Sequence, residues 1–296
     1  MSLRIGFIGL GNMGRPMAER LIGAGFTLAV ADLDRARTDR FAGRAAMPGS
    51  LADLGRASDL VVTILPDGDA VRRVLLGPGD CVAAGLASGA TVIDMSSSAP
   101  VGTRALGEVL AGRGIALIDA PVSGGVRRAE DGALAIMVGG EAPVIERCRP
   151  VLEAMGKHIF LAGSLGSGHA MKALNNYVSA AGLVAASEAV AIGRRFGLDP
   201  ATMVDILNAS TGRNNSTEHK LKQHVLSQGY GSGFGLSLMA KDLRTALDLA
   251  GATGSPAPLA ERCIALWNAA EARLGSAADH TEIARYLEML AEETER

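Results

Sequence analysis

The chain has 296 residues, of which 48% are hydrophobic and 20% are charged, and its net charge is −2. This composition is typical of a globular protein, and the length allows two domains. The charge gives no basic field for nucleic acid, and no apolar run reaches the roughly 18 residues of a membrane helix. Residues 1–10 predict a strand and a glycine turn rather than a signal peptide. The scattered cysteines Cys81, Cys148 and Cys263 predict reduced core thiols in a cytoplasmic protein.

The first half of the chain alternates short apolar runs with helical patterns. Strands that alternate with helices predict βαβ units and a mainly parallel sheet. The expected strands are residues 5–8, 27–31, 60–64, 91–93, 115–118, 134–138 and 159–161. The expected helices are residues 13–24, 33–41, 70–75, 101–111 and 142–155.

The pattern changes near the glycine-rich segment 163–168. Beyond it the sequence shows no convincing strand, and small, helix-forming residues cover positions 170–196. The sequence therefore predicts an α/β domain over residues 1–164 and an all-helical C-terminal domain over residues 165–296. Further helices are expected at residues 201–209, 216–226, 236–250, 259–272 and 281–293.

A glycine-rich turn, Gly9-Leu-Gly-Asn-Met-Gly14, follows the first expected strand and opens the first expected helix. Gly9 permits the tight turn, Gly11 lets a pyrophosphate come close, and Gly14 lets the helix pack on the strand. Together with Asn12 and Met13, the turn presents backbone N–H groups at the positive end of the helix dipole. The motif predicts a dinucleotide-binding Rossmann domain with a doubly wound sheet.

Asp32 ends the second expected strand, 18 residues after Gly14. A carboxylate at this place accepts hydrogen bonds from the adenosine ribose of NAD and repels the 2′-phosphate of NADP. The sequence therefore favours NAD. Arg35 and Arg37 lie nearby and keep NADP open, and a helix N-cap is the structural alternative for Asp32.

Two short segments, Leu65-Pro66 and Ser96-Ser97, follow the expected strands at 60–64 and 91–93. The carboxyl ends of parallel strands meet at one edge of the sheet, which is also the edge of the glycine turn. At this edge the two segments would line the nicotinamide and its ribose. Plain turn chemistry is the alternative.

The run Asp119-Ala-Pro-Val-Ser-Gly-Gly125 follows the apolar strand at 115–118. Gly124 and Gly125 have no Cβ, so their N–H groups can approach an anion, and Ser123 adds a hydroxyl donor. Such a loop beyond a strand's carboxyl end suits a small carboxylate. A flexible turn before the next strand is the alternative.

Lys172 and Asn176 are spaced i, i+4 near the start of the long helix and share one face. Apolar neighbours in the sequence disfavour an ammonium ion, so we expect the pKa of Lys172 to fall from about 10.4 and the amine to transfer protons. Asn176 would hydrogen-bond a substrate oxygen. The alternative is an exposed helix lysine, which is the commonest kind.

Three other charged or polar sets carry weaker signals. Lys241-Asp242 lies among apolar residues at helical spacing, and its alternative is a solvated pair on an amphipathic helix. Arg127-Arg128 suits an acidic substrate or, as the simpler interpretation, a surface turn. His219 and His224 are five residues apart, which does not fit two metal ligands on one helix face, so no metal site is predicted.

Taken together, the motifs resemble the β-hydroxyacid dehydrogenase family, in particular its group of 3-hydroxyisobutyrate dehydrogenases and tartronate semialdehyde reductases. The likeness runs essentially end to end. Four blocks carry it: Gly6-Phe-Ile-Gly-Leu-Gly-Asn-Met-Gly14, Asp119-Ala-Pro-Val-Ser-Gly-Gly125, Gly166-Ser-Gly-His-Ala-Met-Lys-Ala-Leu-Asn-Asn176 and Met239-Ala-Lys-Asp-Leu243.

The resemblance implies a role for each block. The first block would bind the dinucleotide, and Ser123, Gly124 and Gly125 would hold the substrate carboxylate. Lys172 would be the catalytic acid and base, and Asn176 would orient the substrate. Lys241 would help to hold both substrate and nicotinamide, and Ser97 would lie near the cofactor. The implied activity is hydride transfer between NAD and a small 3-hydroxy carboxylate or its semialdehyde, by a homodimer or homotetramer whose helical domain binds substrate and dimerises.

Several alternatives remain open at this point. Arg127-Arg128 and the loop at 210–215 leave the substrate undefined, and a tartronate- or succinic-semialdehyde-type reductase that uses NADPH is one alternative. An imine reductase typically lacks the lysine at Lys172. A non-catalytic dinucleotide-binding module would be expected to lose Lys172 or the Ser123 loop. A 6-phosphogluconate dehydrogenase is disfavoured by the short chain.

Overall fold

The computed structural model describes residues 3–293 and resolves them into two compact units. The first unit ends at Lys172 and the second begins at Ala173. The division falls inside one long helix, α8 (Ser167–Phe196), which is therefore shared by both units. Each unit has its own apolar core.

The first unit is built on an eight-stranded sheet in the order β2-β1-β3-β4-β5-β7-β6, with β8 paired to β7. The first five strands are parallel, whereas β7 runs antiparallel to β5 and β6 and parallel to β8. The strand order changes direction between β1 and β3, which is the switch point where doubly wound sheets bind ligands at their carboxyl edge. The strands are β1 (Arg4–Ile8), β2 (Thr27–Ala31), β3 (Leu60–Thr63), β4 (Thr91–Asp94), β5 (Ala116–Asp119), β6 (Val122–Ser123), β7 (Leu134–Gly139) and β8 (Gly156–Gly163).

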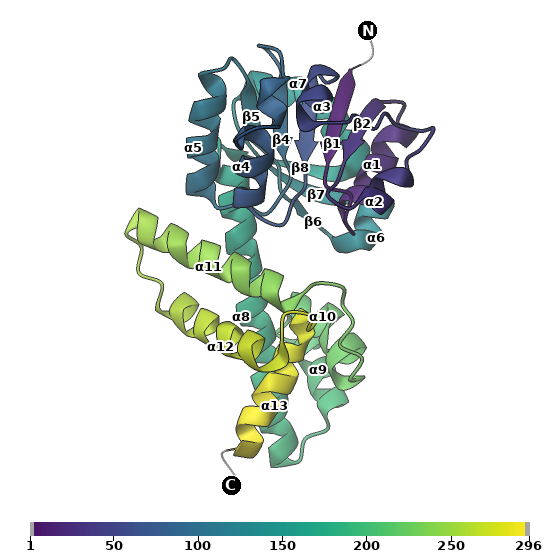
Figure 1. Cartoon of the computed structure of the whole chain (residues 1–296). Helices are drawn as coiled ribbons and strands as arrows, with labels where there is room; N and C mark the ends of the chain where they lie inside the picture. The colour runs from purple at the N-terminus through teal and green to yellow at the C-terminus, as the bar shows by residue number, and fades with distance from the viewer. Residues whose placement is uncertain (1–2, 294–296) are drawn as a thin grey trace. The chain divides into compact units, whose positions relative to one another are not determined.

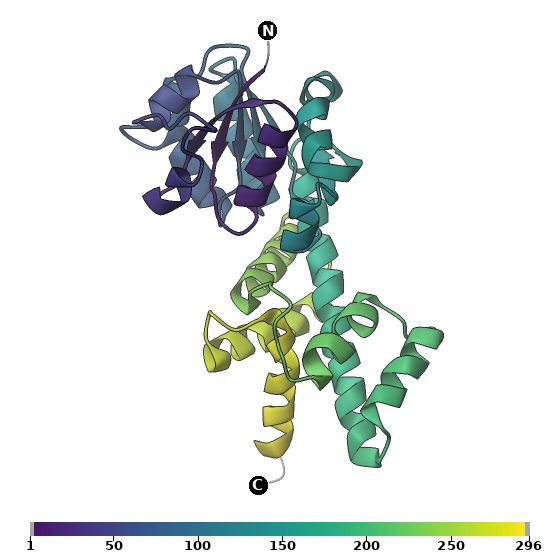
Figure 2. The ribbon, with the colours of Figure 1, turned by 90° about the vertical axis from the view of Figure 1, so that its right-hand side faces the viewer.

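Helices cover both faces of this sheet (Figures 1 and 2). Alternate strand residues point to opposite faces, so Phe7 and Val62 join a core with α1 and α7, whereas Ile8 and Val61 join a core with α3, α4 and α5. Because both faces of the sheet are buried, both sets of alternate residues are apolar, and the strand sequences show no polar alternation. The helices of this unit are α1 (Gly14–Gly23), α2 (Arg35–Asp39), α3 (Leu51–Arg56), α4 (Gly68–Leu76), a 3₁₀ turn (Val82–Ala84), α5 (Pro100–Ala111), α6 (Gly125–Glu130) and α7 (Ala142–Met155).

The second unit is helical, and its residues 173–293 contain no strand. Its core is built around Trp267, whose side chain is fully buried among Leu183, Leu221 and Leu243 of other helices. Over the described residues, no helix combines the length and the apolar character needed to cross a bilayer. Besides α8, the elements are α9 (Pro200–Ala209), α10 (Asn215–His219), a π-helical turn (Leu221–Leu226), α11 (Leu236–Thr253), α12 (Pro258–Leu274), a 3₁₀ turn (His280–Glu282) and α13 (Ile283–Glu293).

Every strand expected from the sequence is present, and most differ only at their ends. The prediction missed α3, α6 and β6, which are too short to show a period. Arg127 and Arg128 lie on α6, so the surface-turn interpretation of this pair was wrong. The helix expected at 216–226 is interrupted at Lys220, where α10 gives way to the π turn.

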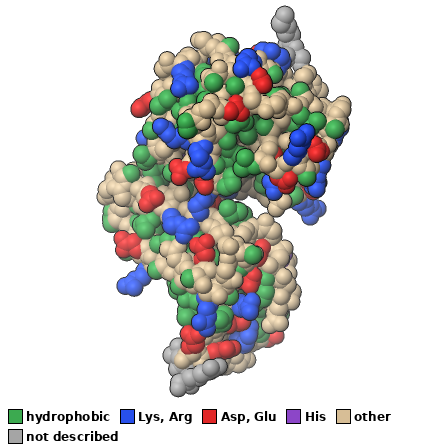
Figure 3. All heavy atoms as spheres, in the orientation of Figure 1, with side chains coloured by type: hydrophobic (Ala, Val, Ile, Leu, Met, Phe, Trp, Pro, Cys, Tyr) green, Lys and Arg blue, Asp and Glu red, His purple; other side chains and the backbone are tan. Residues whose placement is uncertain are grey.

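All three cysteines are buried and unpaired, as the scattered positions suggested. Burial raises the pKa of the Cys148 thiol to about 12 and that of the Cys263 thiol to about 11, so both stay protonated at neutral pH. Acidic and basic side chains are interspersed over the face shown in Figure 3. This mixture agrees with the small net charge.

Candidate active site

The glycine turn between β1 and α1 needs glycine at two positions for packing and leaves the third open. Gly9 has a φ of +98°, and a Cβ there would lie 2.2 Å from the Ile64 carbonyl oxygen. A Cβ on Gly14 would lie 1.8 Å from the Gly9 carbonyl oxygen, so only glycine lets the helix start this close to the turn. A Cβ on Gly11 would meet nothing closer than Arg37 Nη1 at 3.6 Å, which leaves its backbone accessible to a ligand.

A cavity of about 240 Å³ opens beside this turn within the first unit. A phosphate-bearing ligand fits this lining, because the lining contains three arginines and one carboxylate. The residues around the cavity are Leu10, Gly11, Asn12, Arg15, Asp34, Ala36, Arg37 and Arg40.

Asp32, at the end of β2, is held in a fixed orientation. Its two oxygens accept hydrogen bonds from the N–H groups of Leu10 at 2.6 Å and Asp34 at 2.9 Å, and Arg37 Nη1 lies 3.6 Å from it. The cap of α2 is Asp34, whose side chain accepts from Ala36, so the N-cap alternative for Asp32 was wrong. A carboxylate has about four lone-pair sites, so Asp32 retains acceptor capacity for ribose hydroxyls.

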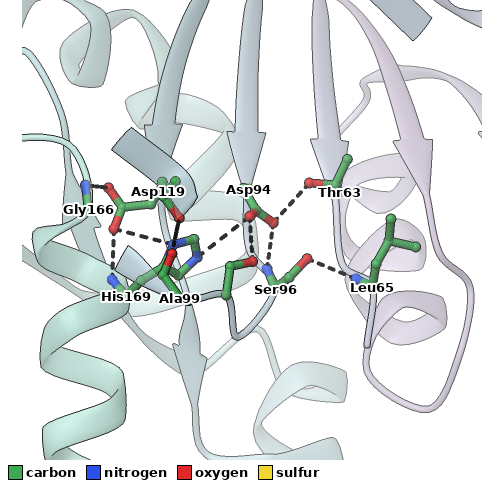
Figure 4. A network of polar contacts seen from close by, with 10 residues as sticks. Thr63, Leu65, Asp94, Ser96, Ala99, Asp119, Gly166 and His169 are labelled. Carbon is green, nitrogen blue, oxygen red and sulfur yellow. Dashed lines mark hydrogen bonds and ion pairs between the residues drawn. The ribbon is translucent and has the colours of Figure 1, made fainter. Parts of the chain in front are cut away.

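The segments after β3 and β4 are joined to each other. Leu65 donates its N–H to Ser96 Oγ at 2.9 Å, and Pro66 follows as an exposed residue. Asp94, which ends β4, accepts from Thr63 Oγ1 at 3.0 Å and from the Ser96 N–H at 3.0 Å. Figure 4 shows this chain of contacts along the sheet edge. Between the buried residues at 96 and 98, Ser97 is only partly buried.

The Ser123 loop adopts a conformation that depends on its glycines. Ser123 lies in the short strand β6, and Gly124 and Gly125 have φ values of +135° and +70°, which other residues rarely adopt. A Cβ on Gly124 would also lie 2.6 Å from the side chain of Arg128. Ser123 is half-buried and both glycines are exposed, so their donors can reach a ligand.

Lys172 is half-buried in the second turn of α8 and belongs to the first unit. The helix starts against the sheet edge, where Asp119 Oδ1 accepts from the Gly166 N–H and Asp119 Oδ2 accepts from the His169 N–H, both at 2.7 Å. These contacts anchor the helix one turn before Lys172. Only some of the apolar neighbours expected around Lys172 are buried: Ala173 is buried, whereas Met171 is 45% exposed.

Asn176, Lys241 and Asp242 are brought together in the second unit. Asn176 Nδ2 donates to Asp242 Oδ2 at 2.5 Å, and Lys241 Nζ lies 3.3 Å from Asp242 Oδ1. Asp242 is only 2% exposed, so the solvated-pair alternative was wrong for this residue. The carboxylate fixes the Asn176 amide, which keeps a second N–H for another acceptor.

Comparison with known proteins covers nearly the whole chain. Residues 4–163 match the model for the NAD-binding domain of 6-phosphogluconate dehydrogenase, and residues 166–287 match the NAD-binding model of NADP-dependent 3-hydroxyisobutyrate dehydrogenase. The 2-(hydroxymethyl)glutarate dehydrogenase of Eubacterium barkeri is 38% identical over 87% of this chain and 86% of its own length. The 2-hydroxy-3-oxopropionate reductase of Escherichia coli is 34% identical over 98% of both chains.

Solved structures agree with the sequence matches. The 3-hydroxyisobutyrate dehydrogenase of Mycobacterium tuberculosis, solved with L-serine, has a TM-score of 0.89 and 32% identity over 97% of this chain and 99% of its own. The chain belongs to the β-hydroxyacid dehydrogenase family. It is an NAD(P)-dependent oxidoreductase that acts on hydroxy acids. The resemblance seen in the sequence is therefore confirmed.

The wider likeness to imine reductases shows only the fold of this β-hydroxyacid dehydrogenase. The enzyme of Myxococcus stipitatus has a TM-score of 0.67 at 20% identity, over 97% of this chain and 100% of its own. A non-catalytic module is no longer an alternative, because the matched relatives are dehydrogenases and reductases.

Sequence reasoning gave no role to three buried polar residues of this dehydrogenase, Asp94, Asp119 and His169, and it weighed Asp242 only as part of the Lys241-Asp242 pair. Each is at most 2% exposed. The only signal was that all four end a strand or lie in a quoted motif. No spacing rule pairs residues as distant as Thr103 and His169, which are 66 positions apart.

Proposed function

We propose that this enzyme transfers a hydride between NAD and a small 3-hydroxy carboxylate of the 3-hydroxyisobutyrate type, or the matching semialdehyde. Residues 1–164 bind the cofactor, and residues 165–296 complete the substrate site and dimerise. The enzyme works as a cytoplasmic homodimer or homotetramer, with no nucleic-acid or membrane partner. The names of relatives, which include 3-hydroxyisobutyrate, 2-(hydroxymethyl)glutarate and 2-hydroxy-3-oxopropionate, support a short hydroxy acid or aldehyde acid as substrate.

The cofactor site uses backbone donors and one carboxylate. Gly9, Gly11 and Gly14, with Asn12 and Met13, hold the pyrophosphate. Asp32 accepts from the adenosine ribose, and Leu65, Pro66, Ser97 and Lys241 surround the nicotinamide end. When bound, NAD supplies the hydride acceptor.

The substrate is held by its carboxylate and its oxygen. The Ser123 hydroxyl and the Gly124 and Gly125 N–H groups donate to the carboxylate, and Lys241 adds a positive charge. Asn176 uses the amide hydrogen that Asp242 leaves available to hold the reacting oxygen. Lys172 takes the hydroxyl proton as the C–H hydride leaves on oxidation, and it returns a proton on reduction.

The observation that carries this assignment is the anchoring of Lys172 in the first unit. The double contact of Asp119 with Gly166 and His169 fixes the start of α8 against the sheet edge from which the Ser123 loop also emerges. A general acid needs a fixed place near the hydroxyl oxygen before its pKa matters.

Replacement of Lys172 by alanine tests the assignment. We expect kcat to fall by about 10²–10⁴, the usual range for general acid–base catalysis, while the NADH dissociation constant changes less than threefold. Lys172→Arg should also be poor, because a guanidinium stays protonated. The assay follows NADH absorbance over a panel of small 3-hydroxy acids and across pH, with folding checked by circular dichroism. A folded Lys172→Ala variant within threefold of wild type would rule out the lysine as the proton-transfer group.

A further inference from the structure

Asp119 is a carboxylate buried in the first unit, beside the start of α8. It is fully buried at the end of β5, and its hydrogen bonds come from backbone N–H groups at the start of α8. Burial raises the pKa of Asp119, and His169 together with these N–H groups acts in the opposite direction. A buried carboxylate is tolerated only where hydrogen-bond donors surround it, so these two N–H groups hold Asp119 in one place.

His169 lies between two such carboxylates. Its Nδ1 is 2.8 Å from Thr103 Oγ1 and 3.8 Å from Asp119 Oδ2, and its Nε2 is 3.7 Å from Asp94 Oδ2. Nε2 is buried and has no hydrogen-bond partner within the described part of the chain. Thr103 Oγ1 also donates to the Ala99 carbonyl oxygen at 3.1 Å, and because a hydroxyl has only one proton, Nδ1–H of His169 is then the donor to Thr103 Oγ1.

Asp94 extends the same set of contacts to the cofactor segments. One of its oxygens accepts from Thr63 and from the Ser96 N–H, and the other accepts from Ser98 Oγ at 2.9 Å. Ser96 in turn accepts from the Leu65 N–H. Figure 4 shows these contacts between the segment after β3 and the start of α8, where the 3.7 Å approach of His169 Nε2 to Asp94 Oδ2 is a link that is not a hydrogen bond.

The space around these contacts is filled. A Cβ on Gly168 would lie 2.2 Å from the Met137 carbonyl oxygen, and one on Gly139 would lie 2.5 Å from Asp119 Oδ1. Two glycines thus let the helix, β7 and Asp119 approach closely, so the carboxylate has little freedom to move. Lys172 follows His169 by three residues, which is slightly less than one helical turn and about 4.5 Å along the axis.

We propose that Asp94, His169 and Asp119 form a positioning network that fixes Lys172 relative to the nicotinamide-binding segments Leu65-Pro66 and Ser96-Ser97. None of the three touches the substrate. They act through Lys172, and the inference therefore rests on the proposed function of that residue. A displacement of about 1 Å between reacting groups can cost about 10²-fold in rate, which is the size of effect that such a network controls.

Two substitutions of His169 separate positioning from bulk. His169→Leu keeps the volume and removes both ring nitrogens, and we expect kcat to fall about 10–100-fold. Substrate KM and the NADH dissociation constant, measured by NADH fluorescence, should stay within threefold. His169→Gln keeps one N–H donor group and one acceptor oxygen in place of the two ring nitrogens, and it should restore kcat to within about fivefold of wild type.

The matched control is another carboxylate that caps a helix. Asp80 accepts from the N–H groups of Leu51 at 2.7 Å and Ala52 at 2.9 Å, which lie at the start of α3 and not of α8. Asp119→Asn keeps one acceptor oxygen and should lower kcat at least tenfold, whereas Asp80→Asn should leave kcat within twofold. If Asp119→Asn does not fold, the comparison of kcat between His169→Leu and His169→Gln tests the inference by itself.

A double-mutant cycle with Lys172→Ala shows whether the network acts through the lysine. We expect His169→Leu to cause less than a threefold further loss when Lys172 is already alanine. A folded His169→Leu variant with kcat within twofold of wild type, or one whose full effect recurs in the Lys172→Ala background, would overturn the inference. An active Lys172→Ala variant would instead overturn the proposed function.

Discussion

The two units stabilise their buried charged side chains in different ways. In the first unit, the buried carboxylates of Asp94 and Asp119 accept from hydroxyl and N–H donors and face one histidine. In the second unit, Asp242 lies beside Lys241 and the amine of Lys220 is itself largely buried against Ser179. Neutral donors fixed in a sheet and its loops hold an anion without mobile countercharges, because their dipoles are already oriented.

This difference suits the chemistry proposed for each unit. In the first unit, the Ser123 loop would bind a substrate carboxylate through a hydroxyl and two N–H groups. The buried carboxylates of that unit are bound by the same kinds of neutral donor. The second unit supplies side chains on helices, where an amide is oriented by an ion pair. The following substitutions test whether that contrast holds.

The largest effect on stability is expected at Asp94. Asp94→Ala leaves three buried donors without their acceptor, at about 1–3 kcal/mol each, so the free energy of unfolding of the first unit should fall by about 3 kcal/mol or more. Urea unfolding followed by circular dichroism measures the change. Ser58→Ala, which removes one buried hydroxyl of the same unit that donates to Leu54, is the control and should cost about 1 kcal/mol. An equal fall in the free energy of unfolding of the two variants would contradict the idea that Asp94 accepts hydrogen bonds from several donors.

Lys220 gives the corresponding test in the second unit. Burial lowers its pKa from about 10.5 to about 8, and Asp279 partly opposes this. The unfolded chain therefore binds more protons between pH 8 and 10.5, so the cost of the buried ammonium is full below pH 8 and disappears as the pH rises. At pH 7 that cost is at most about 3 kcal/mol, and the hydrogen bond to Ser179 offsets about 1 kcal/mol.

Lys220→Met should accordingly be more stable than wild type by about 2 kcal/mol at pH 7 and should lose this advantage by pH 10. Urea unfolding at pH 7, 8.5 and 10 measures it. Lys222, two residues away, is exposed and pairs with Asp205, so Lys222→Met should show no such dependence. A Lys220→Met advantage that stays constant with pH would mean that packing, and not charge, causes it.

The sequence predicted most of the fold and named candidate residues for the chemistry, but it did not reveal the contacts behind them. Strand runs such as 27–31 are apolar and bounded by turns, so their period and length were sufficient. Helix α3 has six residues and strand β6 has two, and neither is long enough to show a periodic pattern. The contacts of Asp119 with Gly166 and His169 join residues 47 and 50 positions apart, and only the tertiary structure brings them together.

Ser123 tests whether neutral donors also hold the substrate. Ser123→Ala removes one donor to a charged group, which is worth about 1.5–3 kcal/mol, so substrate KM should rise about 10–150-fold. The NADH dissociation constant should change less than threefold, since the glycine turn does not include this residue. Steady-state kinetics and NADH fluorescence give the two values. An equal loss of NADH affinity would place Ser123 in the cofactor site.

The smallest expected effect concerns cofactor choice and Arg37, which lies beside the partly buried Asp32. Asp32 already accepts two N–H groups, and Arg37 lies 3.6 Å from it and 3.4 Å from Asp34, so this arginine is drawn toward two carboxylates. A 2′-phosphate would have to displace Arg37 from both acids and approach the negative charge of Asp32. We expect kcat/KM to favour NAD over NADP by at least about tenfold, or 1.4 kcal/mol. Arg37→Ala should leave kcat/KM for NAD within threefold and lower the remaining activity with NADP. A wild-type preference for NADP would show that the positive charge of Arg37, Arg15 and Arg40 around the cavity outweighs the negative charge of Asp32. The adenosine end of the site would then bind its ligand through charged side chains and not through neutral donors.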